Sequence, residues 1–456
     1  MLRPCVVVRE RSCPIVPPRA VYRSRVVPAG ERPLGPVRSG RSGLRTSPQP
    51  GGTAGSARWE DDRVTDRLTL AATLTGPDAP GTTAALMGAI AGLGTEVLDF
   101  EQVVLRGQAT IALLLGSLPA DLATLEDRLA GTCARLGYRL TITEGVGDNP
   151  PRHDRVVVTL LGRPLRATHL AEVGRIVTAQ GGNIDRSRRL ARTPMTSLEL
   201  LVSDADVGRL RPALAVAAAE LGFDVSVSPA GLGRQGRRLV VMDVDSTLIR
   251  DEVIELLARH AGREAEVAAV TERAMRGELD FAQSLHHRVR ALEGLPTSVF
   301  AEVVEAVRLA PGARTLVATL KDLGFAVGLV SGGFIEVVGP LAASLGITHV
   351  HANALEVADG RLTGRVAGPV VDRAAKAETL RRFAAEEGLP LSRTVAIGDG
   401  ANDLDMLAAA GLGVAFNAKP AVRASADTAL NLPYLDAVLY LLGFSREEVE
   451  DAAAMR

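Results

Sequence analysis

Residues 238–248 read RLVVMDVDSTL, in which an apolar run ends at two aspartates, a serine and a threonine. Strands of a parallel sheet are buried on both faces and therefore read as continuous apolar runs, whereas strands with one wet face alternate. Residues 325–330 and 394–397 repeat this pattern, with helical periodicity between them. The sequence therefore predicts an α/β domain with a doubly wound parallel sheet over about 236–446.

A charged helical stretch, about 254–309, separates the first two of these strands. It is too long for an ordinary crossover, and it lies where a lid over the strand ends would be. We predict a helical cap insert there, and we set residues 447–456 apart as a C-terminal tail.

Each of the three buried strands runs into a polar cluster, at 243–247, 331–333 and 399–403. Alone, each cluster has an ordinary explanation as a helix cap or a turn. Ligands of open parallel sheets bind outside the carboxyl ends of the strands, so we expect the three clusters to converge.

Convergence would bring three carboxylates, Asp243, Asp245 and Asp399, into one crevice, with Asp403 close behind. Such carboxylates repel one another and raise their own pKa values unless a cation is present. Oxygen ligands without His or Cys favour Mg²⁺. The residues thus predict metal-assisted phosphoryl chemistry.

Lysine is rare, because only Lys321, Lys376 and Lys419 are lysines among the 52 basic residues. A lysine retained in an arginine-rich chain can indicate a need for a compact point charge. Lys376 opens a helix before the 394–397 strand, which is typical of a phosphate-binding lysine. On this argument alone, a solvated surface position stays equally open. We predict no site for Lys321 or Lys419.

Four segments resemble the ordered motifs of the haloacid dehalogenase superfamily of phosphatases. They are DVDSTL at 243–248, SGGF at 331–334, Lys376, and GDGAND at 398–403. They follow the order of the family over residues 238–445. The resemblance implies the superfamily's α/β core with a cap insert, and a phosphatase activity that depends on Mg²⁺.

Within the superfamily, the chain is most similar to the phosphoserine phosphatase family. Glu252 stands nine residues after Asp243, and residues 277–285 read GELDFAQSL, with Arg288 after them. The similarity implies that Glu252 binds the substrate ammonium, that Arg288 binds its carboxylate and that Phe281 lines the pocket. Taken alone, Glu252 could be an ordinary first-turn acid and Arg288 a surface cation.

The same resemblance implies the catalytic roles. Asp243 would attack phosphorus to give an aspartyl-phosphate, and Asp245 would act as general acid and then as general base. Mg²⁺ would be held by Asp243, Asp399 and the backbone carbonyl of Asp245, with Asp403 supporting these ligands. The phosphoryl group would meet four further residues: Ser331, Gly332, Lys376 and Asn402.

The implied reaction is Mg²⁺-dependent hydrolysis of O-phospho-L-serine, the last step of serine biosynthesis, with serine as a candidate feedback inhibitor. Two alternatives stay open. One is a related phosphatase acting on another small phosphomonoester or on phosphoprotein. The other is a non-catalytic, amino-acid-responsive regulator with a relic hydrolase domain, against which the intact carboxylate set argues.

Two β-α-β-β-α-β units of the ferredoxin-like kind precede this domain, at 63–147 and 152–230. Their helical stretches include 122–136 and 207–221. The topology occurs in small-molecule sensors and in RNA-binding modules. RNA readers stack bases on aromatic side chains of the sheet, and these strands have almost none. We therefore predict no nucleic-acid partner.

The turn GPDAPG at 76–81, which opens a helix, resembles the start of an ACT domain, an amino-acid-sensing module. The second unit keeps the glycine as Gly162 but lacks the aspartate. The resemblance implies a homodimer with L-serine bound between units, and dimerisation alone is the alternative. The candidate effector residues are Gly76, Asp78, Gly162 and Asn183.

The first 58 residues hold eleven Arg and nine Pro and carry a net charge of +9, so the other 398 carry −10 of the total of −1. We predict a disordered Arg/Pro-rich tail over residues 1–62. An organellar transit peptide, a dispensable tail and a misassigned start codon stay open. The three cysteines have no paired spacing, and no unbroken apolar stretch has membrane length. We therefore predict a cytoplasmic protein without membrane contact.

Overall fold

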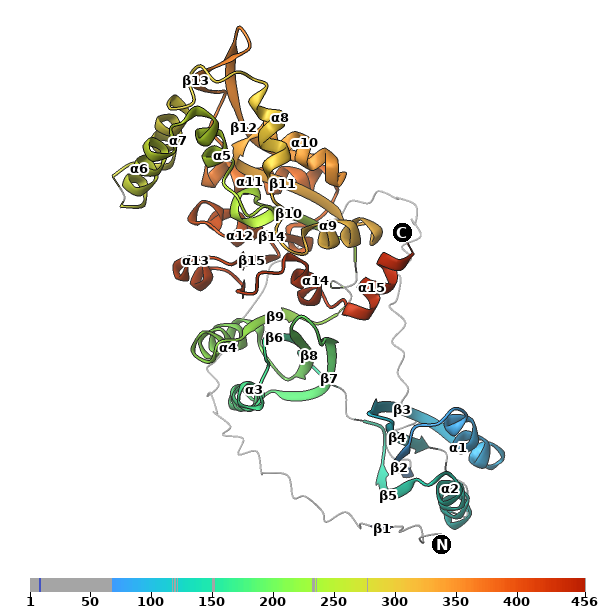
Figure 1. Cartoon of the computed structure of the whole chain (residues 1–456). Coiled ribbons are helices and arrows are strands. Elements are labelled where there is room, and N and C mark those ends of the chain that lie inside the picture. Colours follow the sequence, from blue (N-terminus) through green and yellow to red (C-terminus); the bar gives the residue numbers. More distant parts are fainter. Residues whose placement is uncertain are drawn as a thin grey trace, which may run out of the picture. The chain divides into compact units, whose positions relative to one another are not determined.

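The computed structural model describes residues 8–9, 68–149 and 152–455, apart from residues 117, 119, 121, 232, 233, 235 and 277. The chain forms two compact units, Met1–Pro151 and Arg152–Arg456 (Figure 1). The predicted N-terminal tail lies outside the described residues except for strand β1 (Val8–Arg9), which pairs with β5 (Arg139–Val146).

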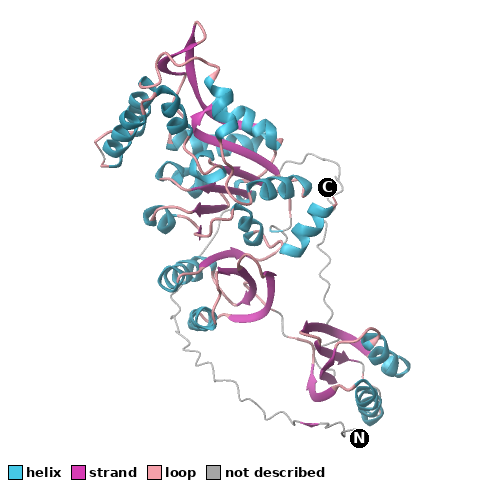
Figure 2. Ribbon diagram, viewed as in Figure 1, coloured by secondary structure: helices cyan, strands magenta, loops and turns pink. Residues whose placement is uncertain are grey.

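The first unit contains the first β-α-β-β-α-β repeat, whose strands lie in the order β1-β5-β2-β4-β3. Its core forms because apolar residues alternate along the strands, as in β2, where Leu70, Ala72 and Leu74 are buried and their neighbours are mostly exposed. Both helices cover the same face (Figure 2). The remaining elements are β2 (Leu68–Pro77), α1 (Thr82–Ile90), β3 (Glu96–Leu105), β4 (Gln108–Gly116) and α2 (Leu122–Leu136).

The second unit begins with the second repeat, an antiparallel sheet in the order β7-β8-β6-β9 with two helices packed on it. Its elements are β6 (Val156–Gly162), α3 (Ala167–Ala179), β7 (Asn183–Ala191), β8 (Thr196–Ser203), α4 (Val207–Leu221) and β9 (Asp224–Pro229). Edge strand β9 meets the following domain, where Thr428 donates a 3.0 Å hydrogen bond to Ser226 and Asn431 donates to Asp224. The second repeat is therefore docked on the α/β domain.

The α/β domain is built on a seven-stranded sheet in the order β13-β12-β11-β10-β14-β15-β16, parallel except for β13. Along the central strand β10, Leu239 and Val241 belong to one hydrophobic core, whereas Val240 and Met242 belong to another. Both faces of the sheet are therefore buried, which explains the continuous apolar run. The strands are β10 (Leu239–Met242), β11 (Ala326–Phe334), β12 (His349–Ala358), β13 (Arg361–Ala367), β14 (Thr394–Gly398), β15 (Leu412–Phe416) and β16 (Thr428–Leu430).

Four helices make up the predicted insert between β10 and β11, and α6 and α7 lie side by side (Figure 1). They are α5 (Val253–Ala261), α6 (Glu264–Met275), α7 (Phe281–Arg290) and α8 (Val299–Ala306). The other helices are α9 (Ala313–Asp322), α10 (Ile335–Leu345), α11 (Arg373–Glu386), α12 (Leu404–Ala409), α13 (Pro420–Ser425), α14 (Val438–Leu441) and α15 (Arg446–Ala454). Helix α15 occupies most of the segment that we set apart as a C-terminal tail.

The predicted fold class is confirmed: two ferredoxin-like units precede a doubly wound, mostly parallel sheet with a helical insert. Within the described residues, no helix is long and apolar enough to cross a bilayer.

Candidate active site

Two aspartates, Asp243 and Asp245, follow the carboxyl end of the central strand β10. Asp243 directly follows β10, and its N–H donates a 2.9 Å hydrogen bond to the carbonyl of Ile397 in β14. This hydrogen bond is the last one between the two strands. The chain then turns sharply, with Ser246 at a positive φ of 57°. This turn brings Asp245 Oδ1 to the N–H of Val253 at the start of α5, at 3.2 Å. The loop thereby fixes both aspartates over the strand ends.

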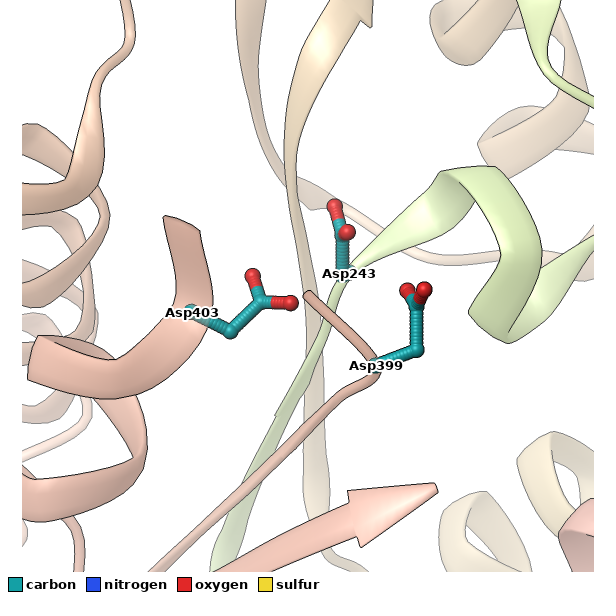
Figure 3. A group of neighbouring side chains, drawn as sticks. All are labelled: Asp243, Asp399 and Asp403. Atoms are coloured by element: carbon teal, nitrogen blue, oxygen red, sulfur yellow. The ribbon is translucent and has the colours of Figure 1, made fainter. Parts of the chain in front are cut away.

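The predicted convergence of carboxylates is confirmed (Figure 3). Asp243, Asp399 and Asp403 each offer an oxygen atom, and these atoms all lie within 4.8 Å of one another. Thr247 Oγ1 donates a 3.0 Å hydrogen bond to Asp399 Oδ1, and the N–H of Gly400 donates a 2.9 Å hydrogen bond to Asp403 Oδ2. Three fixed carboxylates at this spacing could hold a hard divalent cation.

Lys376 is fully buried beneath this cluster, so the surface alternative for it is wrong. Asp372 caps α11 by accepting a 2.9 Å hydrogen bond from the N–H of Ala375, which places Lys376 in the first turn. Its Nζ lies 2.8 Å from Asp243 Oδ1 and 2.7 Å from Asp403 Oδ1. Burial lowers the pKa of Lys376, but the two carboxylates outweigh it and raise this pKa above its usual value. The lysine is therefore a permanent cation.

The aspartates have strongly perturbed pKa values. Burial, with the charge of Glu252 next in size, raises the pKa of Asp245 to about 8. Burial and the nearby Asp403 raise the pKa of Asp399 to about 6, and burial and Asp403 also raise the pKa of Asp243 well above its usual value. One lysine does not compensate this many carboxylates, so the donor set fits a bound cation.

A cavity of about 770 Å³ opens above the cluster, between the sheet edge and the insert. Eight predicted site residues line it: Asp243, Asp245, Glu252, Phe281, Arg288, Gly332, Asp399 and Asn402. The other three, Ser331, Lys376 and Asp403, are fully buried and do not line it. The structure therefore brings most of the predicted phosphoryl- and substrate-binding residues of this domain to one cavity, with Lys376 buried behind Asp243.

The insert contributes a pair of opposite charges to this cavity. Glu252 precedes α5 and accepts a 2.9 Å hydrogen bond from Ser246 Oγ, whereas Arg288 lies on α7. Burial lowers the pKa of Arg288, and the carboxylates of Glu252 and Asp245 oppose that shift. Burial raises the pKa of Glu252. A half-buried anion and a half-buried cation in one pocket suit a zwitterionic ligand.

Phe281, the first residue of α7, closes the cavity over the loop that follows Ser331. A Cβ atom added to Gly332 would lie 3.1 Å from Cζ of the Phe281 ring. A larger side chain at this position would require the Phe281 ring to shift, because the insert approaches the backbone so closely.

Sequence reasoning missed several residues of the site. Ser246 and Thr247 orient Glu252 and Asp399, and their place inside the DVDSTL segment could have indicated this. Lys419 lines the cavity, although we predicted no site for it. Asn353, on β12, hydrogen bonds the carbonyl of Gly332, and no motif pointed to it.

The candidate effector residues lie at or directly after strand ends of the two repeats. Gly76 must be glycine because the ring of Tyr138 lies against it, 2.5 Å from where a Cβ would be. The N–H of Asp78 donates a 2.9 Å hydrogen bond to Gly107. Gly162 occupies the corresponding strand end in the second repeat, and Asn183 donates a 2.8 Å hydrogen bond to Asp185. Their effector role stays a prediction.

Comparison with known proteins agrees with this geometry. Residues 240–408 match the haloacid dehalogenase-like hydrolase family, and residues 69–143 and 154–228 each match an ACT domain family. The chain is 56% identical to a phosphoserine phosphatase of Streptomyces coelicolor over 86% of this chain and 96% of that protein. It is 49% identical to a phosphoserine phosphatase of Mycobacterium tuberculosis over 85% of this chain and 96% of that protein.

A solved structure of a probable phosphoserine phosphatase from Vibrio cholerae superposes with a TM-score of 0.51 at 34% identity, covering 66% of this chain and 89% of that one. The matches include the carboxylate cluster, the insert and both N-terminal repeats. The chain therefore belongs to the phosphoserine phosphatase family, with two ACT domains ahead of a haloacid dehalogenase-like hydrolase domain.

Proposed function

We propose that this protein hydrolyses O-phospho-L-serine to L-serine and phosphate with Mg²⁺, as the last step of serine biosynthesis in the cytoplasm. One observation carries the proposal: Glu252 and Arg288 line the same cavity as Asp243. The pair suits the ammonium and carboxylate of an amino acid, and Asp243 suits an attack on its phosphate. The relatives named phosphoserine phosphatases support the same substrate.

In the proposed first step, a carboxylate oxygen of Asp243 forms a bond to phosphorus while the bond from phosphorus to the serine oxygen breaks. Asp245 supplies the proton to the leaving oxygen, because a pKa of about 8 keeps it protonated near neutral pH. In the second step, Asp245 takes a proton from water as that water attacks phosphorus and releases Asp243. Lys376, 2.8 Å from Asp243, favours the carboxylate form of this residue and opposes the effect of burial on its pKa.

The phosphoryl oxygens would be held by the hydroxyl of Ser331, the N–H of Gly332 and the side chain of Asn402. Lys376 contributes its positive charge from behind the nucleophile. These donors are fixed before substrate arrives, since Ser331 and Lys376 are fully buried. Preorganised donors lower the energy of the transition state without a reorganisation cost.

Asp243, Asp399 and the backbone carbonyl of Asp245 would hold Mg²⁺, with Asp403 supporting them. The carboxylate geometry fits such an ion. When bound, Mg²⁺ neutralises charge between the nucleophile and the phosphate.

Magnesium should stabilise the protein more strongly at higher pH. A carboxyl with a raised pKa in the folded chain favours folding while it is protonated; this contribution is complete below about pH 4 and is lost as the pH rises through the folded-state pKa. For Asp399 and Asp245 those values are about 6 and about 8. The metal-free unfolding temperature should therefore fall from about pH 5.5 to about pH 8, while the Mg²⁺-induced rise grows.

Thermal unfolding in EDTA and in excess MgCl₂ measures both effects. Asp399→Asn provides the control, because it should abolish most of the response to Mg²⁺ and flatten the pH dependence. A Mg²⁺-induced shift of the same size at both pH values would contradict this assignment of the metal site.

Arg288→Ala should lower kcat/KM for O-phospho-L-serine by about 10- to 100-fold, because the substrate carboxylate loses a charge-assisted hydrogen bond. Hydrolysis of p-nitrophenyl phosphate, which has no amino-acid carboxylate, should change little. The matched control is Arg290→Ala, an exposed arginine on the same helix. Equal losses on both substrates would favour the alternative of a phosphatase for other phosphomonoesters.

A substrate panel with and without Mg²⁺ separates the remaining alternatives. Turnover of phosphoprotein, or of another phosphomonoester in preference to O-phospho-L-serine, would show that O-phospho-L-serine is not the substrate. No turnover together with tight L-serine binding would revive the amino-acid-responsive regulator.

A homodimer is supported by strand β3, which forms an edge of the first ACT sheet. Nine of its ten residues are exposed, among them Val97, Phe100, Val103 and Leu105. A long edge strand with exposed apolar side chains is a template for pairing with another chain. We therefore propose that two copies meet at β3.

L-Serine is the effector we propose for the ACT domains, acting as a feedback inhibitor. Light scattering should give a dimer, and calorimetric titration of the full chain with L-serine should give heat that Asp78→Ala reduces. Binding that survives this change but disappears when O-phospho-L-serine fills the active site would move the serine to the catalytic cavity. If the protein is a monomer and titration with L-serine gives no heat, the ACT domains have neither the proposed dimerisation role nor the proposed effector-binding role.

A further inference from the structure

Asn353 on β12 connects two segments that face the catalytic cavity. Its side chain is 1% exposed. Its Nδ2 donates a 2.8 Å hydrogen bond to the carbonyl of Gly332, and its Oδ1 accepts a 2.7 Å hydrogen bond from the N–H of Val371. Both hydrogen bonds are long-range in sequence. The first ends on Gly332, a predicted substrate-binding residue, and the second ends on Val371, two residues before the helix that carries Lys376.

The first of these hydrogen bonds replaces one that the sheet cannot make. The register between β11 and β12 shifts between Ser331 and Phe334, so the two glycines between them leave the regular ladder. A buried carbonyl without a partner costs about 1–3 kcal/mol, and Asn353 supplies the missing donor to Gly332. Asn353 thereby holds the shifted backbone of the two glycines in place.

The carbonyl of Gly332 and the N–H of Gly333 belong to the same peptide group. That N–H donates a 2.8 Å hydrogen bond to Ser331 Oγ. Asn353, the peptide and Ser331 thus form a chain in which each hydrogen bond polarises the next. Because Ser331 Oγ accepts from Gly333, its own proton is available for a phosphoryl oxygen.

The second hydrogen bond of Asn353 fixes the approach to α11. Val371 immediately precedes Asp372, whose side chain caps this helix. Lys376 lies one turn later and contacts Asp243. One buried amide therefore holds the loop of Ser331 and the helix of Lys376 at a fixed separation, although it does not line the cavity itself.

We propose that Asn353 is a positioning residue for phosphoryl binding, acting through the Gly332–Gly333 peptide and the start of α11. This inference rests on the proposed function, since it concerns the phosphate end of the same site. It assigns to Asn353 a role beyond packing: the residue sets how tightly the site binds a phosphate, not only how stably the domain folds.

Two variants and one control test this. Asn353→Leu removes both hydrogen bonds and keeps the same branched arrangement of side-chain heavy atoms. Asn353→Asp keeps the acceptor for Val371 but places a carboxylate oxygen against the carbonyl of Gly332. The control is Thr394→Val. Thr394 is fully buried at the start of β14, whereas Asp399 follows the other end of that strand, and Thr394 makes hydrogen bonds with Leu391 and Gly411.

Calorimetric titration with inorganic phosphate and Mg²⁺ measures the affinity of the phosphate site without turnover. Thermal unfolding measures the stability of each variant. Both Asn353 variants should bind phosphate about tenfold or more weakly, whereas Thr394→Val should lose stability to a similar degree and bind phosphate normally. In steady state, the Asn353 variants should raise KM for O-phospho-L-serine.

Phosphate affinities within about twofold of wild type in both Asn353 variants, with unfolding temperatures lowered as in the control, would overturn the inference. Since Asn353→Asp is nearly isosteric, it keeps the test available if Asn353→Leu fails to fold. A wild-type protein that binds phosphate but does not hydrolyse O-phospho-L-serine would refute the proposed function and leave the phosphate comparison intact.

Discussion

Asp243→Asn is expected to reduce kcat for O-phospho-L-serine by about 10⁴-fold or more, to the level of the background reaction. The amide has almost the shape of the carboxylate, but it cannot form the bond to phosphorus. Lys376 keeps a partner in the variant, because its Nζ also lies 2.7 Å from Asp403. The loss should therefore be chemical and not a consequence of a disordered lysine.

The stability of Asp243→Asn makes this prediction sharper. The pKa of Asp243 is raised, first by burial and then by Asp403, so its surroundings disfavour the charged form. Without metal near neutral pH, the neutral variant should unfold at the same temperature as wild type or at a higher one. Asp405→Asn, which removes an acid that lines the cavity beside Arg373, is the matched control and should retain most activity. Retained activity in Asp243→Asn would show that the nucleophile is assigned wrongly.

Lys376→Met is expected to destabilise the protein by about 3–5 kcal/mol and to remove most activity. The change leaves Asp243 and Asp403 buried without their common cation. Removing one partner of a buried ion pair is costly because the remaining charge stays desolvated. Chemical denaturation in EDTA measures the loss of stability, and phosphate release measures the loss of activity.

A second substitution separates charge from shape. In Lys376→Met/Asp403→Asn, one of the two orphaned carboxylates becomes neutral, so stability should partly return while activity should not. Lys321→Met is the control, because Lys321 is an exposed lysine on α9 away from the cavity. If Lys376→Met unfolds at the wild-type denaturant concentration, the ion pairs of the buried lysine do not stabilise the fold as we infer.

The parts of the fold that were predictable are those with a strong local pattern. Helices α2 and α4 have the predicted bounds, 122–136 and 207–221, because their buried residues recur at helical spacing. Strand β10 was evident because it is buried on both faces. The hairpin of β12 and β13 was not identified, although Asp359-Gly360 between the two strands is a local turn signal. Strand β16 was missed because three residues are too short to show a pattern.

The same distinction applies to the site. Asp243, Asp245 and Asp399 follow buried strands, so topology alone predicted that they would meet. The burial of Lys376 could not be derived from its spacing, because a helix start can face solvent or the sheet. Asn353 and Lys419 were missed because their contacts join segments far apart in sequence, which no local pattern records.

The central claim is that Asp243 becomes phosphorylated while O-phospho-L-serine is hydrolysed. The most direct measurement is an acid quench of the Mg²⁺-loaded protein within one turnover of phosphate-labelled O-phospho-L-serine, followed by peptide mapping. The account predicts an acid-stable, base-labile label on the peptide that contains Asp243, with none in Asp243→Asn. Rapid phosphate release without any protein-bound label on that aspartate, or a label on another residue, would contradict it.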